Sequence, residues 1–202
     1  MNFAGIKNII KLLCIMPFLI GIWLIVLIEL GLVYVDVEQA DRDDTLAAYQ
    51  KEAQLDPDNA EGWNQLGLLL LRTGELAQAE EAFRKVLALG EAHQDKEVQV
   101  GVLGNLGGVY RVRGELDKAE EMHLKSLELN KALGRKEGMA NQYTNLGSLY
   151  EDCGKLDNAE AMWRKSLSLY EEMGAMRHPK ARMIQQALLK VEQADRDDTL
   201  AD

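Results

Sequence analysis

Few side chains in this sequence combine a reactive type with the spacing that chemistry requires. The three histidines, His93, His123 and His178, lie far apart, and none has a second histidine or a cysteine pair at the spacing of a metal site. Cys14 and Cys153 fall in different parts of the chain, so no disulfide between them is expected. No phosphate-binding loop, nucleophile elbow or carboxylate pair follows a predicted strand. The sequence therefore predicts no enzyme, no cofactor and no bound metal ion.

The charged residues of the chain are mostly acidic. Lys and Arg number 23 against 33 Asp and Glu, which gives a formal net charge of -10. This balance argues against a nucleic-acid partner, which would need a basic surface. Glutamates recur beside lysines at helical intervals, and this pattern predicts solvated helix faces. These residues are Glu80, Glu81, Glu120, Glu121 and Glu160, with Lys85, Lys125 and Lys165.

Two asparagines have the chemistry and the register of a binding surface. Asn105 and Asn145 each directly precede a Leu-Gly pair, and Gln65 has the same place before Leu66. A side-chain amide both donates and accepts hydrogen bonds, so a row of amides can pair with the backbone of an extended peptide. The alternative is that these amides only satisfy the backbone of neighbouring helices. The sequence leaves both interpretations open.

The amides belong to a pattern that occurs three times at a spacing of forty residues. A period of this length is typical of supersecondary units that stack and share one core. The aligned positions are Leu66, Leu106 and Leu146; Gly67, Gly107 and Gly147; Leu70, Tyr110 and Tyr150; Gly74, Gly114 and Gly154; Leu76, Leu116 and Leu156; Ala79, Ala119 and Ala159; and Leu87, Leu127 and Leu167.

Each unit is predicted to be a pair of helices. Large apolar residues fall at helical spacing before and after a central glycine. Gly74, Gly114 and Gly154 are expected to adopt the left-handed conformation that ends a helix. The small residues Gly107 and Ala119 are expected to mark the closest approach of the two helices. The unit is therefore an αα-hairpin.

The unit resembles a tetratricopeptide repeat (TPR), whose signature is an aromatic residue, Leu-Gly, a Tyr, an Ala and a second aromatic residue. Unit one has Trp63, Leu66, Gly67, Ala79 and Phe83, and unit three has Tyr143, Leu146, Gly147, Tyr150, Ala159 and Trp163. Unit two has Leu103 and His123 at the aromatic positions, where His123 is expected to be a half-buried packing residue. The forty-residue period is longer than the family's usual thirty-four and is similar to repeats of kinesin light chain and nephrocystin type. The resemblance covers about residues 44–175.

The resemblance implies that the first helices line the concave face of a solenoid and that a protein partner binds there. The asparagines resemble those with which kinesin light chain type repeats clamp a cargo peptide. The face lacks the concentration of Lys and Asn by which chaperone-binding members hold a C-terminal carboxylate, so that ligand is not expected. The expected face residues are Asn64, Gln65, Leu68, Arg72, Gly104, Asn105, Gly108, Arg111, Thr144, Asn145, Ser148 and Glu151.

An apolar segment precedes the repeats. Residues 12–35 carry one charge, Glu29, and at about 1.5 Å per residue they are long enough to span a hydrocarbon core of about 30 Å as a transmembrane helix. Lys7 and Lys11 precede the segment and acidic residues follow it, which favours a cytoplasmic N-terminus and repeats on the outer, periplasmic side. A cleaved signal peptide is the alternative, although no small-x-small cleavage site follows the apolar run.

The sequence thus predicts an all-α protein: an α-solenoid of three TPR helix pairs with a capping helix at each end, preceded by one transmembrane helix. A half-unit that ends at Pro57 is expected to cap one side. A helix from Lys180 to about Ala194 is expected to cap the other with an apolar stripe of Ala181, Ile184, Leu188 and Val191. The predicted segments are a basic N-terminus at 1–11, the transmembrane helix at 12–35, a linker and capping helix at 36–59, three repeat units within 60–178 (60–99, 100–139 and 140–178), and a capping helix with a tail at 179–202.

The expected function is that of a membrane-anchored adaptor whose repeats bind a protein or peptide partner. The alternative is a structural scaffold at the membrane that assembles with copies of itself into a homo-oligomer. The segment VEQADRDDTLA occurs at residues 37–47 and again at 191–201. Its second copy is interpreted as a recombination scar in an acidic tail, or alternatively as an imitation of the N-terminal cap that docks on a neighbouring molecule.

Overall fold

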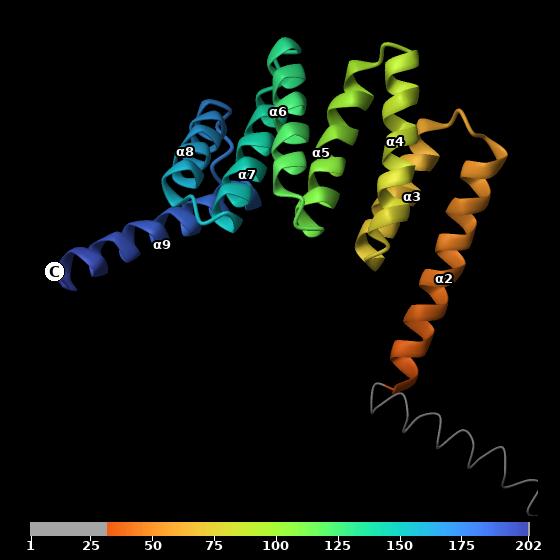
Figure 1. Ribbon diagram of the computed structural model, residues 1–202, viewed down its shortest axis with the longest axis horizontal. Coiled ribbons are helices and arrows are strands. Elements are labelled where there is room, and N and C mark those ends of the chain that lie inside the picture. Colours follow the sequence, from red (N-terminus) through yellow and green to blue (C-terminus); the bar gives the residue numbers. More distant parts are fainter. Residues whose placement is uncertain (1–31, 202) are drawn as a thin grey trace, which may run out of the picture. The chain divides into compact units, whose positions relative to one another are not determined.

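The structure, a computed structural model, describes residues 32–201. The chain forms two compact units, Met1–Lys51 and Glu52–Asp202, and the described residues of the first unit lie in one helix. All regular elements of the described range are α-helices, as predicted (Figure 1). They are α2 (Leu32–Leu55), α3 (Ala60–Thr73), α4 (Leu76–Ala92), α5 (Lys96–Val112), α6 (Leu116–Ala132), α7 (Lys136–Asp152), α8 (Leu156–Glu172) and α9 (Pro179–Ala201).

The helices from α3 to α8 form three hairpins, α3–α4, α5–α6 and α7–α8, which follow one another in chain order (Figure 1). A glycine turn separates the two helices of each hairpin. Gly74, Gly114 and Gly154 have φ angles of 86°, 76° and 71°. The predicted left-handed conformation is therefore confirmed at all three positions, where a side chain would be strained.

The connections between successive hairpins use the same conformation. Gly134 and Gly174 both have a φ angle of 67°, and Gln94 at the corresponding place after α4 has a φ angle of 55°. Gln94 is thus a side chain in a backbone conformation that favours glycine. The next residue, Asp95, caps α5 by accepting hydrogen bonds from the backbone N–H groups of Glu97 and Val98 at 3.0 and 3.1 Å.

A ring lies over the glycine of each Leu-Gly pair. The pairs are Gly67 with Phe83, Gly107 with His123, and Gly147 with Trp163. A side-chain carbon added to Gly107 would lie 2.5 Å from Cε1 of His123. The close contact that requires glycine at this position is therefore with His123. That Gly107 and Ala119 mark the closest approach of the two helices stays a prediction. His123 is only 1% exposed, more deeply buried than expected, because its ring fills the space over the missing side chain.

Buried hydroxyl groups connect the two helices of the second and third hairpins. Ser126 donates to the backbone carbonyl of Val100 at 2.9 Å, and Ser166 donates to the backbone carbonyl of Ala140 at 2.8 Å. Both serines are fully buried, so each hydroxyl needs such a partner. The sequence did not reveal these bonds, because a helical serine is equally compatible with a solvated position.

The C-terminal helix α9 packs on the third hairpin. Ala181 and Ile184 are fully buried and share a core cluster with Trp163 and Tyr170. The predicted apolar stripe therefore covers this hairpin. The helix is longer than expected and continues to Ala201, because the second copy of VEQADRDDTLA contains neither Gly nor Pro to end it. The first copy is also helical, within α2.

The predicted transmembrane helix at 12–35 lies outside the described residues except for positions 32–35. Within residues 32–201, no helix is both long enough and apolar enough to cross a membrane. The predicted basic N-terminus at 1–11 and the alternative of a cleaved signal peptide likewise fall outside the described part of the chain.

Candidate functional site

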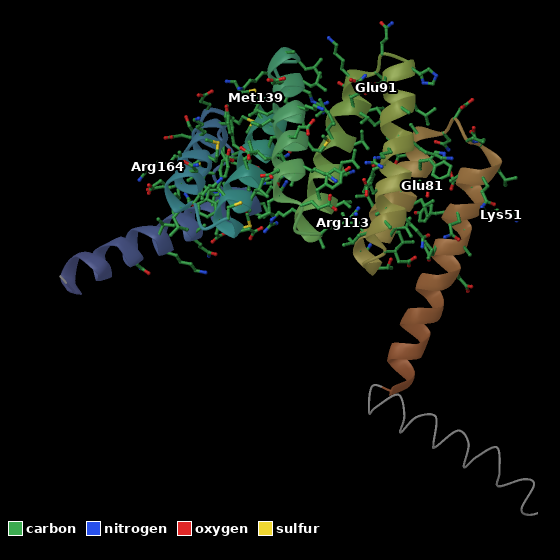
Figure 2. The ribbon with its side chains drawn as sticks, viewed as in Figure 1. Lys51, Glu81, Glu91, Arg113, Met139 and Arg164 are labelled. Atoms are coloured by element: carbon green, nitrogen blue, oxygen red, sulfur yellow. The ribbon has the colours of Figure 1, made fainter. Side chains whose placement is uncertain are left out.

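The helices α3, α5 and α7 are the first helices of the three hairpins, and the surface they share is called here the first-helix face. Eleven of the twelve expected face residues are at least partly accessible on these helices. The half-buried ones are Asn64, Gln65, Leu68, Gly104, Asn105, Gly108, Asn145 and Ser148, and the exposed ones are Arg72, Arg111 and Glu151. Exposed side chains of the second helices include Glu81 and Arg164 (Figure 2).

Thr144 was also predicted to belong to this surface, but its side chain is only 4% exposed. Its hydroxyl donates to the backbone carbonyl of Ala140 at 2.9 Å and lies 2.9 Å from the hydroxyl of Ser166 on α8. Thr144 therefore packs inside the third hairpin. Its position directly before Asn145 places it one residue around the helix, toward α8.

The two predicted asparagines have different surroundings. The amide nitrogen of Asn105 donates to the amide oxygen of Asn64 at 3.1 Å, so this pair bridges α3 and α5. The side-chain amide of Asn145 has no hydrogen-bond partner among the described residues. Gln65, in the same register, donates to Glu61 on its own helix. Only Asn145 of these three amides is left entirely for solvent or a ligand.

An ion pair also bridges the first helices. Arg111 donates from Nε and Nη2 to the two carboxylate oxygens of Asp152 at 2.5 and 3.3 Å, which joins α5 to α7. Both side chains are about 40% exposed, so the pair contributes little to stability. The carboxylate of Asp152 nevertheless neutralises the charge of Arg111 on the first-helix face.

A groove of about 670 Å³ opens between α5 and α7, and it is called here the α5–α7 groove. Its walls include both predicted asparagines, Asn105 and Asn145. Its volume lies within the range of about 300–1,000 Å³ that is usual for ligand sites. The groove is lined by Val100, Gly101, Gly104, Asn105, Asn130, Gly134, Arg135, Lys136, Glu137, Gly138, Asn141, Gln142, Asn145, Met173 and Lys180.

The rim of the groove carries amide and ammonium groups that the sequence analysis did not identify. The amide oxygen of Asn141 accepts hydrogen bonds from Lys180 Nζ at 2.8 Å and from Tyr170 Oη at 3.2 Å. Asn141 precedes Asn145 by four residues on α7, and this helical spacing is the sequence signal that could have found it. Lys180 belongs to α9, so it lies at the groove only because α9 packs on the third hairpin.

The floor of the groove includes the buried side chain of Asn130, at the end of α6. Its amide nitrogen donates to the backbone carbonyl of Ser126 at 2.9 Å. Its Oδ1 is buried and has no hydrogen-bond partner among the described residues. A side-chain carbon added to Gly138 would collide with this oxygen, so glycine at 138 provides the space for Asn130.

Gln142, another residue of the groove lining, holds the buried ring of His123: His123 Nδ1 lies 3.0 Å from Gln142 Oε1. Burial lowers the pKa of His123, and the hydrogen bond with Gln142 offsets this only in part. The imidazole is therefore neutral at pH 7 and donates from Nδ1 to Gln142, which lines the groove.

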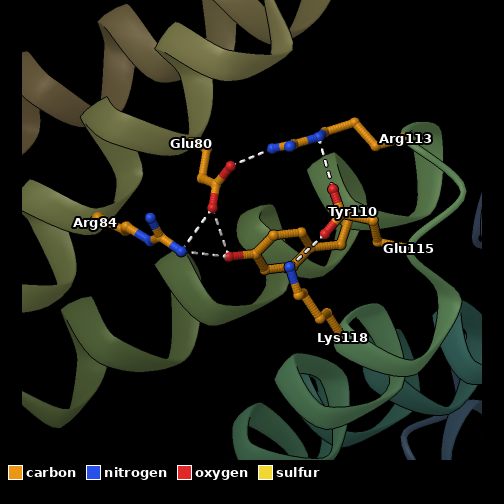
Figure 3. A network of polar contacts seen from close by, with 6 residues as sticks. All are labelled: Glu80, Arg84, Tyr110, Arg113, Glu115 and Lys118. Atoms are coloured by element: carbon orange, nitrogen blue, oxygen red, sulfur yellow. Dashed lines mark hydrogen bonds and ion pairs between the residues drawn. The ribbon is translucent and has the colours of Figure 1, made fainter.

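A separate polar cluster joins the first two hairpins (Figure 3). Glu80 on α4 accepts hydrogen bonds from Tyr110 Oη at 2.8 Å and from Arg113, and it pairs with Arg84 at 2.7 Å. Its side chain is 12% exposed, so the expectation of a solvated residue is wrong for Glu80, whereas Glu81 is exposed. Burial raises the pKa of Glu80, but the bond from Tyr110 and the charge of Arg84 outweigh burial and hold it below its usual value.

The same contact recurs at the next junction. Tyr150 donates to Glu120 at 2.5 Å, and burial together with this bond raises the pKa of Tyr150 to about 12. At the first junction the cluster extends from Arg113 to Glu115 at 2.8 Å and from Glu115 to Lys118 at 2.6 Å (Figure 3). These contacts hold each hairpin against the next and leave the α5–α7 groove as the candidate binding site.

The described residues contain no group of three or more His, Cys, Asp and Glu side chains placed to hold a metal ion. The groups that line the groove are suited to hydrogen bonding and charge recognition.

Comparison with known proteins identifies the fold. Residues 32–168 match the family profile described as the cilia and flagella-associated protein 70 middle TPR-like domain. This chain belongs to that TPR-like family. The TPR-like region contains all of the first-helix face and most of the α5–α7 groove. No curated protein matches the chain.

Solved structures similar to this TPR-like protein include three with 20–22% sequence identity, a likeness that shows the fold alone. BtubC (BKLC) from P. vanneervenii has a TM-score of 0.62 and 20% identity over 78% of this chain and 66% of that one. MamA has a TM-score of 0.53 and 22% identity over 79% of this chain and 94% of that one. The TPR domain of Arabidopsis FLU has a TM-score of 0.53 and 20% identity over 56% of this chain and 95% of that one.

Proposed function

We propose that this TPR-like protein is an interaction adaptor that binds an extended segment of a protein partner in the α5–α7 groove. The observation that carries the proposal is the position of the groove between two successive first helices, with Asn105 and Asn145 in its walls. Amide side chains there present donors and acceptors in the register of a peptide backbone. The forty-residue period and these asparagines resemble the cargo-binding repeats of kinesin light chain, which supports the same function.

Site-specific photo-crosslinking tests this proposal. The photoreactive amino acid p-benzoylphenylalanine is introduced into the full chain at Ser148 on the first-helix face, and at Glu81 and Glu121 on second helices as matched controls. In the cells that naturally produce the protein, irradiation is expected to give discrete adducts from the first-helix position only.

The mass of the adduct separates the two functions. An adduct with another protein supports the adaptor. An adduct of twice the mass of the chain would contradict the adaptor and support the self-assembling scaffold. Equal crosslinking from the second-helix controls would refute binding at the first-helix face.

We propose further that residues 12–35 anchor the protein in a membrane with the repeats on the periplasmic side. The support is the length of the apolar segment, with Lys7 and Lys11 before it and acidic residues after it. Protease added to intact bacterial spheroplasts is expected to digest the repeats. Protection until lysis would reverse the orientation, and release of the intact protein from membranes by alkaline carbonate would refute the anchor.

A further inference from the structure

The first turn of the C-terminal helix α9 is bonded to both helices of the third hairpin. Lys180 Nζ donates to Oδ1 of Asn141 on α7 at 2.8 Å. The same oxygen accepts from the hydroxyl of Tyr170 on α8 at 3.2 Å. The rest of the contact is apolar, through the buried side chains of Ala181 and Ile184. The polar contacts that position α9 are therefore concentrated at its start.

His178 is the N-cap residue of α9. Its backbone carbonyl accepts the first hydrogen bond of the helix, from the N–H of Arg182 at 3.2 Å. Its Nδ1 lies 3.2 Å from the backbone nitrogen of Lys180. These are the two bonds expected of an N-cap residue, whose side chain is usually that of Ser, Thr, Asp or Asn. By contrast, α3 and α5 are capped by side-chain oxygens, those of Asn59 and Asp95.

The cap exists only in the neutral form of His178. A backbone N–H can only donate, so Nδ1 is the acceptor and the proton of the neutral ring is on Nε2. The ring is also stacked on Tyr170, with 5.2 Å between the ring centroids and 16° between the planes. The side chain of His178 thus connects the N-terminus of α9 to α8.

A proton on Nδ1 would reverse this contact. It converts the acceptor into a donor that faces the N–H of Lys180, and it adds a positive charge at the positive end of the helix dipole. Histidine is the side chain that gains such a charge between pH 8 and pH 5. A fall in pH over this range therefore replaces a stabilising contact of α9 with a repulsive one.

The charged groups around His178 do not compensate for this proton. Lys136 and Glu172 pair with each other at 3.0 Å. The other charged or titratable groups on the adjoining chain ends are Glu137 on α7, Tyr170 and Glu171 on α8, Arg177 in the connection, and Lys180 and Arg182 on α9. Tyr170 stays neutral, because burial and the charge of Glu137 raise its pKa. Three cations thus stand against two acids, and among the described residues no acid lies at ion-pair distance from His178.

We propose that His178 is a pH-dependent cap that controls whether α9 stays docked on the third hairpin. When His178 is neutral, α9 is capped and covers the core cluster that contains Trp163 and Tyr170. When His178 is protonated, α9 detaches in a larger fraction of the molecules and uncovers this cluster. The same event removes Lys180 from the α5–α7 groove. This inference goes beyond the proposed function and does not depend on it.

Hydrogen–deuterium exchange of the full chain in detergent tests the proposal. Exchange is measured by mass spectrometry at pH 7.5 and pH 5.5, and each rate is corrected for the intrinsic rate at that pH to give a protection factor. Peptides from α9 are compared with peptides from α3 and α4 in the same sample. We expect the ratio of α9 protection to α3–α4 protection to fall at least fivefold at pH 5.5, because the end helix of a repeat array can open by itself.

Variants of His178 separate the cap from other effects of acid. His178→Asn keeps a side-chain acceptor but cannot gain a proton, so the ratio is expected to be the same at both pH values. His178→Ala has no acceptor, so α9 is expected to be weakly protected at both. His93→Asn, the matched control, changes an exposed histidine at the end of α4 and is expected to keep the fivefold fall.

Each outcome supports or overturns the inference. A fall smaller than fivefold in the original chain overturns it. A fall that persists in His178→Asn assigns the effect to another group, such as His123, and also overturns it. Strong protection of α9 in His178→Ala at pH 7.5 would show that the cap does not hold the helix. If His178→Ala does not fold, which its α3–α4 peptides report, His178→Asn alone decides.

Discussion

Alanine variants of two adjacent glycines of α5, Gly107 and Gly108, distinguish the cost of a close contact from the gain in helix propensity. Gly107→Ala would place a methyl group 2.5 Å from Cε1 of His123 and within 2.8 Å of both ring nitrogens. Gly108→Ala would place the same group in open space. Both positions are inside the helix, where Ala is favoured over Gly by about 1 kcal/mol. We therefore expect Gly108→Ala to raise the free energy of unfolding by about 1 kcal/mol.

The ring of His123 has little room to give way to a methyl group at 107. It is 1% exposed and bonded to Gln142 at 3.0 Å, so a shift would break a buried hydrogen bond. Overpacking of this kind costs about 1–3 kcal/mol. Because the helix-propensity gain is common to both variants, the free energy of unfolding of Gly107→Ala should lie about 1–3 kcal/mol below that of Gly108→Ala.

Urea unfolding measures this difference in free energy. It is followed both by circular dichroism at 222 nm and by tryptophan fluorescence, because coincident transitions show that the repeats unfold together. The background variant His123→Ala supplies the control. Without the ring, Gly107→Ala should stabilise the protein as Gly108→Ala does. Equal free energies for the two glycine variants in the original chain, or a cost of Gly107→Ala that persists without the ring, would refute the assigned contact.

Three other predictions concern the turns and the titrating groups. Gln94→Gly should raise the urea midpoint, because glycine relieves a left-handed conformation that costs about 1–2 kcal/mol, whereas Gly134→Ala at the equivalent turn should lower it. Burial lowers the pKa of His123 in the folded protein, so below the unfolded pKa of about 6.5 the unfolded chain binds more protons. The contribution of neutral His123 to the free energy of unfolding is fully present above that pH and is lost as the pH falls toward the folded pKa. His123→Phe should therefore reduce the drop in urea midpoint between pH 7.5 and 5. An unchanged drop would show that other groups cause it. Tyr150 should titrate near pH 12 by NMR, and Glu120→Gln should lower that pKa; an unaltered titration would show that the bond does not contribute.

The sequence by itself determined the helical hairpins and their repetition. Apolar residues at helical spacing and Gly74, Gly114 and Gly154 at fixed intervals act within one or two turns of the chain, so they specify the same local structure in every unit. It also indicated the register of the asparagines on the first helices. The left-handed turns after the second helices were not predicted. Glycine does not recur at this position, because the first of these turns has Gln94 and only the other two have glycines, Gly134 and Gly174.

Only the tertiary structure decided which side chains meet. Glu80 and Glu81 are neighbours of the same type, yet one is enclosed by Tyr110 and Arg113 from the next hairpin and the other is exposed. Periodicity along a helix defines a face, but it does not state what the adjacent helix places opposite that face.

The two asparagines show the same limit. Asn105 and Asn145 have identical places in their repeats, but Asn64 lies beside the first and Gly104 has the equivalent position for the second. The groove that results is completed by Lys180 from α9, far along the chain. Hydrogen bonds and ion pairs act over about 3–4 Å, so their partners are set by how the hairpins pack and not by the spacing of residues within one of them.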